Sequence, residues 1–182
     1  MKSKKDHLLE LFFNYPTKQW HFEEILTQSK LARSKTDQWL KRFRKEKLIT
    51  RIKEYKKMPY YIANYSSANY KNNKKIYALQ KLHNSGLLNH LSNLPNAQSV
   101  ILFGSFSRSD WYNNSDIDIF IYGDTETLKI APYELKLHRD IQLFIAKNPT
   151  ELQELGTPLL QNIIKGNIIK GNIDFVRVEI NA

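Results

Sequence analysis

Two aspartates separated by one residue are the side chains of this chain best suited to metal chemistry. Asp116 and Asp118 lie in residues 115–122, which otherwise have the mostly apolar composition of a buried strand. Side chains at positions i and i+2 of a strand point to the same face, so the two carboxylates are expected side by side. Two such charges repel each other and are costly to bury, and a hard divalent cation such as Mg²⁺ offsets that cost. The alternative is an edge strand whose acids face water.

A phosphate-binding turn is predicted upstream of the two aspartates. Residues 99–103 form a mostly apolar run of strand length, Gly104 and Ser105 form a turn, and residues 106–109 can begin a helix. Glycine lets the backbone approach an oxyanion, serine donates a hydroxyl, and a helix start presents free N–H groups. A Gly-Ser pair alone is an ordinary turn. The ten residues that separate Ser105 from Asp116 make it part of a larger pattern.

This pattern resembles the signature of the minimal nucleotidyltransferases in the DNA polymerase beta superfamily. The matching segments are residues 102–109 and 114–118, and the likeness extends over about residues 75–180. The resemblance implies a mixed β-sheet flanked by helices, with two Mg²⁺ ions held by Asp116 and Asp118. One metal would activate the acceptor hydroxyl and the other would support the triphosphate, so that pyrophosphate leaves in line. The residues implied in nucleotide binding are Gly104, Ser105, Arg108 and Ser115.

The chain departs from the family at the third acid, which commonly lies on a later strand. Residues 140–145 predict that strand, and Gln142 stands at the matching position. An amide cannot act as a general base and offers a metal only a neutral oxygen. Asp140 is two residues earlier on the same face and can substitute if the register shifts, so it joins Asp116 and Asp118 as a candidate catalytic residue. The alternative is that Asp140 is only a charged residue at the start of the strand and has no catalytic role.

The charge of the chain is unevenly distributed. Residues 1–95 contain 20 Lys and Arg against 7 Asp and Glu, a net charge of +13, whereas residues 96–182 contain 8 against 11, a net charge of −3. The first half is therefore expected to bind a polyanion.

The chain has no cysteine, which excludes disulfides and thiolate zinc sites. No apolar run approaches the roughly 20 residues of a membrane span, so a cytoplasmic location and no membrane partner are expected.

Periodicity in the first half predicts helices at about residues 6–14, 22–28 and 34–47, followed by strands at 48–52 and 60–63 around a turn. A short second helix, a turn and a basic third helix are typical of a helix-turn-helix. The segment resembles winged-helix domains of archaeal and bacterial regulators, which implies that the third helix enters the major groove of duplex DNA and the hairpin follows the phosphates. The alternative is a solvated helix face and hairpin tip. The residues expected to contact DNA are Arg33, Lys35, Gln38, Lys41, Arg42, Lys53, Lys56 and Lys57.

The sequence thus predicts an α+β protein with an N-terminal winged helix-turn-helix domain (residues 1–65), a linker with packing helices (66–95) and a nucleotidyltransferase domain (96–182). One function is Mg²⁺-dependent transfer of a nucleoside monophosphate, with AMP from ATP as the expected group, to a hydroxyl of a protein, nucleic acid or small molecule. Small family members with this motif include antitoxins that adenylylate a partner toxin, which implies a toxin-like acceptor protein. The alternative is a DNA-binding transcriptional regulator whose nucleotidyltransferase domain only senses a nucleotide, with turnover removed by Gln142.

Overall fold

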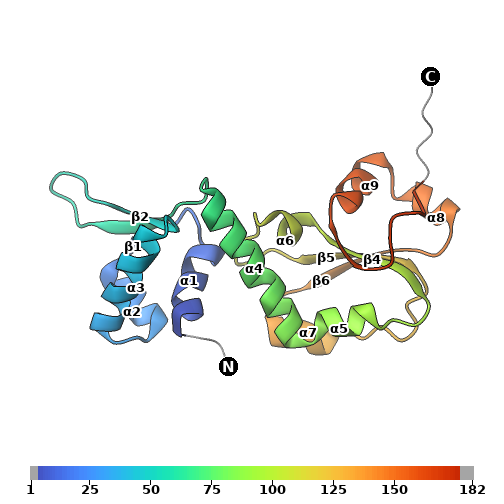
Figure 1. Ribbon diagram of the computed structural model, residues 1–182, viewed down its shortest axis with the longest axis horizontal. Coiled ribbons are helices and arrows are strands. Elements are labelled where there is room, and N and C mark those ends of the chain that lie inside the picture. Colours follow the sequence, from blue (N-terminus) through green and yellow to red (C-terminus); the bar gives the residue numbers. More distant parts are fainter. Residues whose placement is uncertain (1–3, 177–182) are drawn as a thin grey trace, which may run out of the picture. The chain divides into compact units, whose positions relative to one another are not determined.

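The computed structural model describes residues 4–176, which fold into two compact units (Figure 1). Unit 1 comprises the chain up to Tyr77 together with Ser109–Asn113, and unit 2 comprises Ala78–Arg108 and the chain from Asn114 onward. Helix α4 (Ala68–Ser85) contributes to both units. The predicted boundaries at residues 65 and 95 remain predictions. Within residues 4–176, none of the helices combines the length and the apolar character that a membrane crossing requires.

Besides the first part of α4, unit 1 contains helices α1, α2 and α3 and a three-stranded antiparallel sheet with the order β1-β3-β2. The helices and the two longer strands agree with the predicted ranges to within two residues. Strand β1 was not predicted, because two residues are too short to show a period. The elements of unit 1 before α4 are, in chain order, α1 (Lys4–Asn14), β1 (Trp20–His21), α2 (Phe22–Ser29), α3 (Arg33–Lys45), β2 (Ile49–Ile52) and β3 (Tyr60–Ala63).

The core of unit 1 forms because each helix carries one apolar stripe. In α3 the buried residues are Thr36, Leu40 and Phe43, which recur at helical spacing, while the lysines and arginines of the helix face solvent. Helix α1 buries Phe12 and Phe13 in the same core. The basic face of α3 is therefore held outward by packing of the opposite face.

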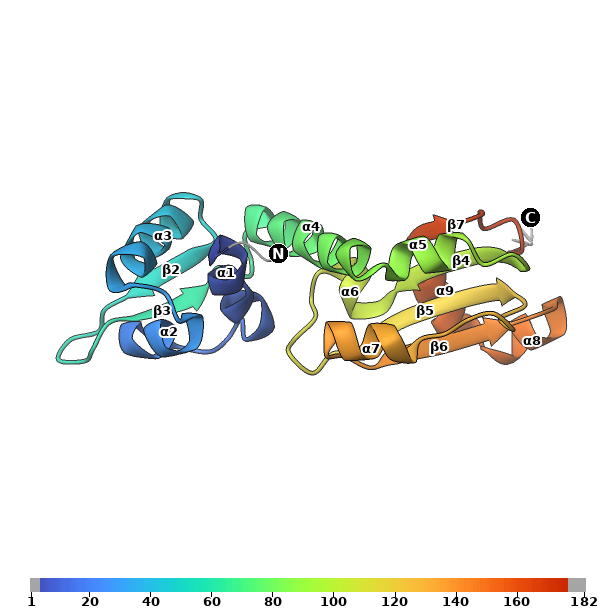
Figure 2. The same ribbon diagram turned by 90° about the horizontal axis from the view of Figure 1, so that it is seen from below.

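Unit 2 is built on a four-stranded mixed sheet with the order β6-β5-β4-β7, in which β5 and β6 are parallel and the other pairs antiparallel. Helices lie on both faces, with α5 and α7 on one and α9 on the other (Figure 2). This mixed α+β arrangement agrees with the predicted fold class. Its remaining elements are α5 (Leu87–Ser92), β4 (Ala97–Phe103), α6 (Gly104–Arg108), β5 (Ile117–Gly123), α7 (Ala131–Leu137), β6 (Ile141–Ala146), α8 (Pro149–Glu154), α9 (Thr157–Ile164) and β7 (Asn167–Lys170).

The central strand β5 is apolar on both faces because helices cover both sides of the sheet. Ile117, Ile119 and Phe120 are fully buried, and one core cluster joins Phe120 to residues of β4, α8 and α9. Asp118 is the single charged residue within β5. A charge at such a position requires compensation, which makes it the starting point for a functional site.

Candidate functional site

Strand pairing places Asp118 at the end of β4, next to the turn that follows it. In the antiparallel register Asp118 is the partner of Phe103, and Gly104 is the next residue of the chain. Asp118 is half-buried, and Asp116, which precedes β5 by one residue, is exposed. The predicted phosphate turn and the predicted metal ligands are therefore neighbours in space.

Gly104 allows the turn to approach Asp118 more closely than any other residue would. Its φ is +67°, in the left-handed region that favours glycine. A Cβ added at this position would lie 1.9 Å from Oδ2 of Asp118, which is far inside van der Waals contact. The backbone N–H of Ser105 donates a hydrogen bond to the Asp118 carboxylate. The glycine is thus required by the carboxylate itself.

The charges around Asp118 act on its protonation in opposite directions. Burial raises the pKa of Asp118 above its ordinary value, and the nearby negative charge of Asp116 raises it further. The guanidinium of Arg108 and the N–H of Ser105 lower that pKa, and the two raising effects prevail. Gly104, Ser105, Arg108 and Asp116 are therefore all gathered around Asp118.

Arg139 connects the two motifs, and sequence reasoning missed it. Its Nη1 donates a hydrogen bond of 2.8 Å to the carbonyl oxygen of Ser115, directly before Asp116. Its guanidinium carbon lies 5.1 Å from the centre of the Phe106 ring in α6. The partners of Arg139 are 24 and 33 residues away in the chain, so no local pattern indicates the contact. Arg139 holds the segment that carries the carboxylates against the helix of the phosphate turn.

Strand β6 places Gln142 beside Asp118. In the parallel register Ile141 is paired with Ile117 and Gln142 with Asp118, and the Gln142 side chain is exposed. Asp140 lies one residue before β6, where its carbonyl oxygen accepts a hydrogen bond of 2.9 Å from the N–H of Ile117. In the described chain, residues 4–176, no three Asp, Glu or His side chains form a group able to hold a metal ion. The register therefore gives Asp118 an amide neighbour from β6.

Glu134 of α7 has a structural role at the start of β6. Its carboxylate oxygen Oε1 accepts a hydrogen bond of 3.0 Å from the N–H of Ile141. Its carbonyl oxygen accepts another from the N–H of Arg139. Glu134 thus fixes the start of β6 and, with it, the register of Gln142.

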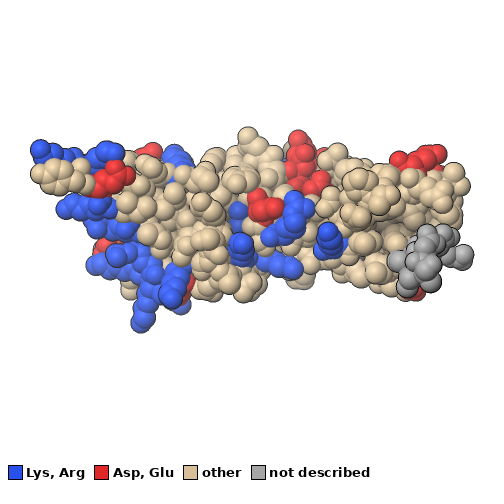
Figure 3. All heavy atoms as spheres, turned by 90° about the horizontal axis from the view of Figure 1, so that it is seen from above, with Lys and Arg blue, Asp and Glu red and all other residues tan. Residues whose placement is uncertain are grey.

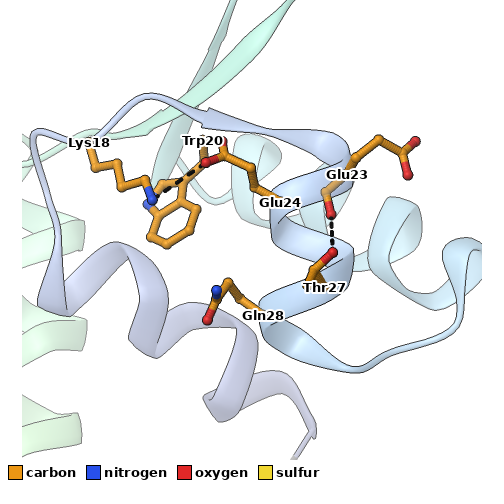
Figure 4. A pocket seen from close by; sticks show the side chains of 6 residues that line it. All are labelled: Lys18, Trp20, Glu23, Glu24, Thr27 and Gln28. Carbon is orange, nitrogen blue, oxygen red and sulfur yellow. Dashed lines mark hydrogen bonds and ion pairs between the residues drawn. The ribbon is translucent and has the colours of Figure 1, made fainter.

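The pocket in Figure 4 belongs to unit 1 and has a volume of about 300 Å³. Lys18 Nζ lies 3.9 Å from the centre of the Trp20 ring and forms an ion pair of 3.5 Å with Glu24. None of the lining residues is a predicted metal, nucleotide or catalytic residue. The lining residues are Lys18, Trp20, Glu23, Glu24, Thr27 and Gln28.

The predicted DNA contacts are all exposed, five on α3 and three between β2 and β3. Lysine and arginine side chains gather over unit 1, at the left of Figure 3. Four of the eight predicted residues form ion pairs with acids of the same unit. These pairs are Arg33 with Glu23 at 2.8 Å, Lys41 with Asp37 at 2.7 Å, Arg42 with Glu46 at 2.7 Å and Lys57 with Glu54 at 2.5 Å.

The comparison with known families identifies the second half of the chain. A family model described as "Polymerase beta, Nucleotidyltransferase" matches residues 86–179, slightly more than half of the chain. The match includes the phosphate turn, both aspartates and β6. No curated protein and no solved structure matches the chain. The motif, its geometry and the family match agree, and the chain belongs to the polymerase beta nucleotidyltransferase family.

Proposed function

We propose that the protein is a Mg²⁺-dependent nucleotidyltransferase that transfers a nucleoside monophosphate, AMP from ATP, to a hydroxyl of a protein, nucleic acid or small molecule. One observation carries the proposal: the turn at Gly104 approaches the Asp118 carboxylate so closely that no side chain fits between them. A phosphate held at this turn would lie beside the carboxylates. That proximity is what a metal-assisted transfer of a nucleotide requires.

Asp116 and Asp118 are the proposed metal ligands. The raised pKa of Asp118 reflects burial and the charge of Asp116, so the pair bears an electrostatic cost that a cation would offset. Carboxylate oxygens are the donors that Mg²⁺ prefers. When bound, Mg²⁺ would neutralise these carboxylates and the triphosphate oxygens, which favours attack at the α-phosphorus and departure of pyrophosphate. The two carboxylates are the proposed anionic ligands for both ions implied by the family resemblance.

Ser105, Arg108 and Ser115 are the proposed phosphate ligands. Arg108 is close enough to Asp118 to lower its pKa, so its positive charge also reaches a phosphate placed between them. Ser115 is held by the hydrogen bond from Arg139 to its carbonyl oxygen. These three side chains would orient the triphosphate beside the carboxylates.

Transfer and its nucleotide preference are tested by incubating the full chain with Mg²⁺, cell extract and one nucleoside triphosphate at a time, labelled at the α-phosphate. The proposal expects label from ATP on an acceptor in the extract. A labelled protein would identify the toxin-like partner that the family resemblance implies. Label from GTP, CTP or UTP alone would contradict the assignment of AMP, and no label from any nucleotide would contradict transfer.

We further propose that unit 1 is a winged helix-turn-helix domain that binds duplex DNA through α3 and the β2–β3 hairpin. The order of its elements and its exposed basic residues support this proposal. The ion pairs that these residues form are exposed, and such pairs contribute only about 0–1 kcal/mol each, so DNA phosphates can replace the acidic partners. A cytoplasmic location belongs to the same proposal, because DNA and nucleoside triphosphates occur together there. Binding that does not weaken with rising salt would contradict it.

A second function is favoured by the position of Gln142. Because Gln142 is the register partner of Asp118, β6 supplies a neutral amide where the family commonly has an acid. A regulator that binds Mg·ATP without transferring AMP would fit this arrangement. Binding of Mg·ATP by calorimetry together with no labelled acceptor would favour this sensing function over the enzyme.

A further inference from the structure

Trp111 is a buried residue between the two motifs of the nucleotide site. Its side chain is 2% exposed. The centre of its ring lies 6.2 Å from that of Phe13 in α1 and 6.3 Å from that of Tyr77 in α4, and the last pair is stacked. Lys74 Nζ lies 4.4 Å from the centre of the Trp111 ring and donates a hydrogen bond of 2.5 Å to the Trp111 carbonyl oxygen. Trp111 is thus anchored on α1 and α4.

The segment around Trp111 belongs to a different unit from the motifs that it connects. Ser109–Asn113 is part of unit 1, whereas the chain up to Arg108 and from Asn114 onward belongs to unit 2. A second contact strengthens the anchor: the N–H of Asn113 donates a hydrogen bond of 2.9 Å to the carbonyl oxygen of Asn14, the last residue of α1. The spacer between the motifs is therefore not a free loop.

Residues of the nucleotide site lie close to both ends of this anchored segment. Arg108 directly precedes it and lowers the pKa of Asp118 through its charge. Ser115 and Asp116 follow it by two and three residues, and Arg139 holds the Ser115 carbonyl. Displacement of the middle of the segment would act on the phosphate ligands at one end and on a metal ligand at the other.

We propose that Trp111 is a positioning residue of the nucleotide site, which acts by anchoring the Ser109–Asn113 segment on α1 and α4. The inference rests on the proposed function and deepens it. A spacer without an anchor samples many conformations, and ordering it when nucleotide binds costs conformational entropy. Burial of Trp111 orders the spacer before the nucleotide arrives. Loss of the anchor therefore weakens nucleotide binding even though every ligand residue remains.

The test is isothermal titration of the full chain with Mg·ATP, which reports Kd and the fraction of competent sites separately. Trp111→Ala should raise Kd by roughly tenfold, within the range usual for coupling between sites, at unchanged stoichiometry. A purely structural role would instead lower the stoichiometry and leave Kd unchanged. Trp111→Phe keeps a ring against Phe13 and Tyr77 and should restore most of the affinity.

Trp20→Ala is the matched control. Trp20 is also 2% exposed and packs on α1, with its ring centre 6.5 Å from that of Phe12, but it belongs to β1 and lies far along the chain from the motifs. It should leave the Kd for Mg·ATP unchanged. If Trp111→Ala does not fold, Lys74→Met removes the hydrogen bond to the Trp111 carbonyl and keeps an apolar chain in the same place. Lys74→Met should raise Kd in the same direction.

The outcomes separate this inference from the proposed function. Wild-type affinity in folded Trp111→Ala, or in Lys74→Met when the first variant does not fold, overturns the inference alone. An equal rise of Kd in Trp20→Ala also overturns it. A wild-type chain that binds no Mg·ATP, or an Asp118→Asn variant that binds it like wild type, overturns the proposed function and the inference together.

Discussion

Asp118 is unfavourably placed for a charge as long as no cation is bound. Burial and the charge of Asp116 raise its pKa, so the folded state binds a proton at Asp118 more readily than the unfolded state does. The stability that this proton contributes is complete below the ordinary pKa of aspartate and is lost as the pH rises through the raised pKa. The same proton competes with Mg²⁺, because a protonated carboxyl is a poor metal ligand.

Nucleotide binding should therefore weaken as the pH falls through the raised pKa of Asp118. Asp116→Asn removes the like charge, so it should lower that pKa and leave the free protein at least as stable as wild type. It should also abolish Mg²⁺-dependent nucleotide binding. Carboxyl titration by NMR, thermal unfolding and calorimetry with Mg·ATP measure the three effects. An unchanged pKa of Asp118 or loss of the fold would contradict the assignment of the pair.

Gln142 is the residue at which the chain could regain a third acid. Removal of a positioned base typically costs roughly 10²–10⁴ in rate, so transfer by the natural protein should be slow but measurable. Gln142→Glu should raise the rate, since its register partner is Asp118. Asp140→Asn is the control for the other register and should change the rate little. If Asp140→Asn removes most of the activity and Gln142→Glu changes nothing, Asp140 has the role of the third acid. The label-transfer assay decides between them.

The turn between β4 and α6 is an element whose geometry depends on one glycine. Gly104→Ala introduces both a strained φ and an overlap with Asp118, so it should destabilise the fold by about 1–3 kcal/mol and abolish nucleotide binding. Gly86→Ala is the matched control, because Gly86 also has a positive φ, of +89°, but its added Cβ would meet nothing closer than 3.7 Å. Gly86→Ala should reduce the stability and preserve binding. Wild-type nucleotide binding by Gly104→Ala would contradict the close approach.

Helix α3 presents the basic face proposed to bind DNA. Alanine at Lys35 and Lys41 together should weaken binding of duplex DNA and make the slope of log K against log salt shallower by about 0.9 per lost phosphate contact. Alanine at Lys129 and Lys147 of unit 2 removes the same charge from exposed positions and should change the slope little. Fluorescence anisotropy at several salt concentrations measures both pairs. Equal effects of the two pairs would show an unspecific charge effect.

Helices and strands could be predicted from the sequence wherever apolar residues recur with a regular spacing. The strands and side chains that they contact could not be predicted in this way. Apolar spacing gives α1, α2, α3 and the buried strand β5 directly, and motif spacing assigns the Gly104–Ser105 turn and the two aspartates to one motif. The close approach of Gly104 to Asp118 is visible only in the structure. The parallel pairing of β5 with β6 depends on the sheet, and only the register identifies Gln142 as the neighbour of Asp118. The contacts of Arg139 with Ser115 and of Trp111 with Phe13 join distant parts of the chain and leave no periodic signal.

The whole molecule combines a basic first half with a nucleotidyltransferase second half. The charge of +13 on residues 1–95 and of −3 on residues 96–182 favours the proposal that the two halves bind different partners. The chain nevertheless passes through unit 1 between the phosphate turn and the carboxylates, at Ser109–Asn113. We therefore expect the proposed nucleotide site to depend on how this segment is anchored at Trp111.

Transfer of label from α-labelled ATP tests the central claim most directly. The wild-type chain, Asp116→Asn and Asp118→Asn are incubated under identical conditions with Mg²⁺ and cell extract, and again with excess chelator. The account predicts a labelled acceptor with the wild-type chain and Mg²⁺ only, and none with either variant or with chelator. Labelling that persists in Asp118→Asn, or that is independent of Mg²⁺, would contradict the claim that these carboxylates form the active site.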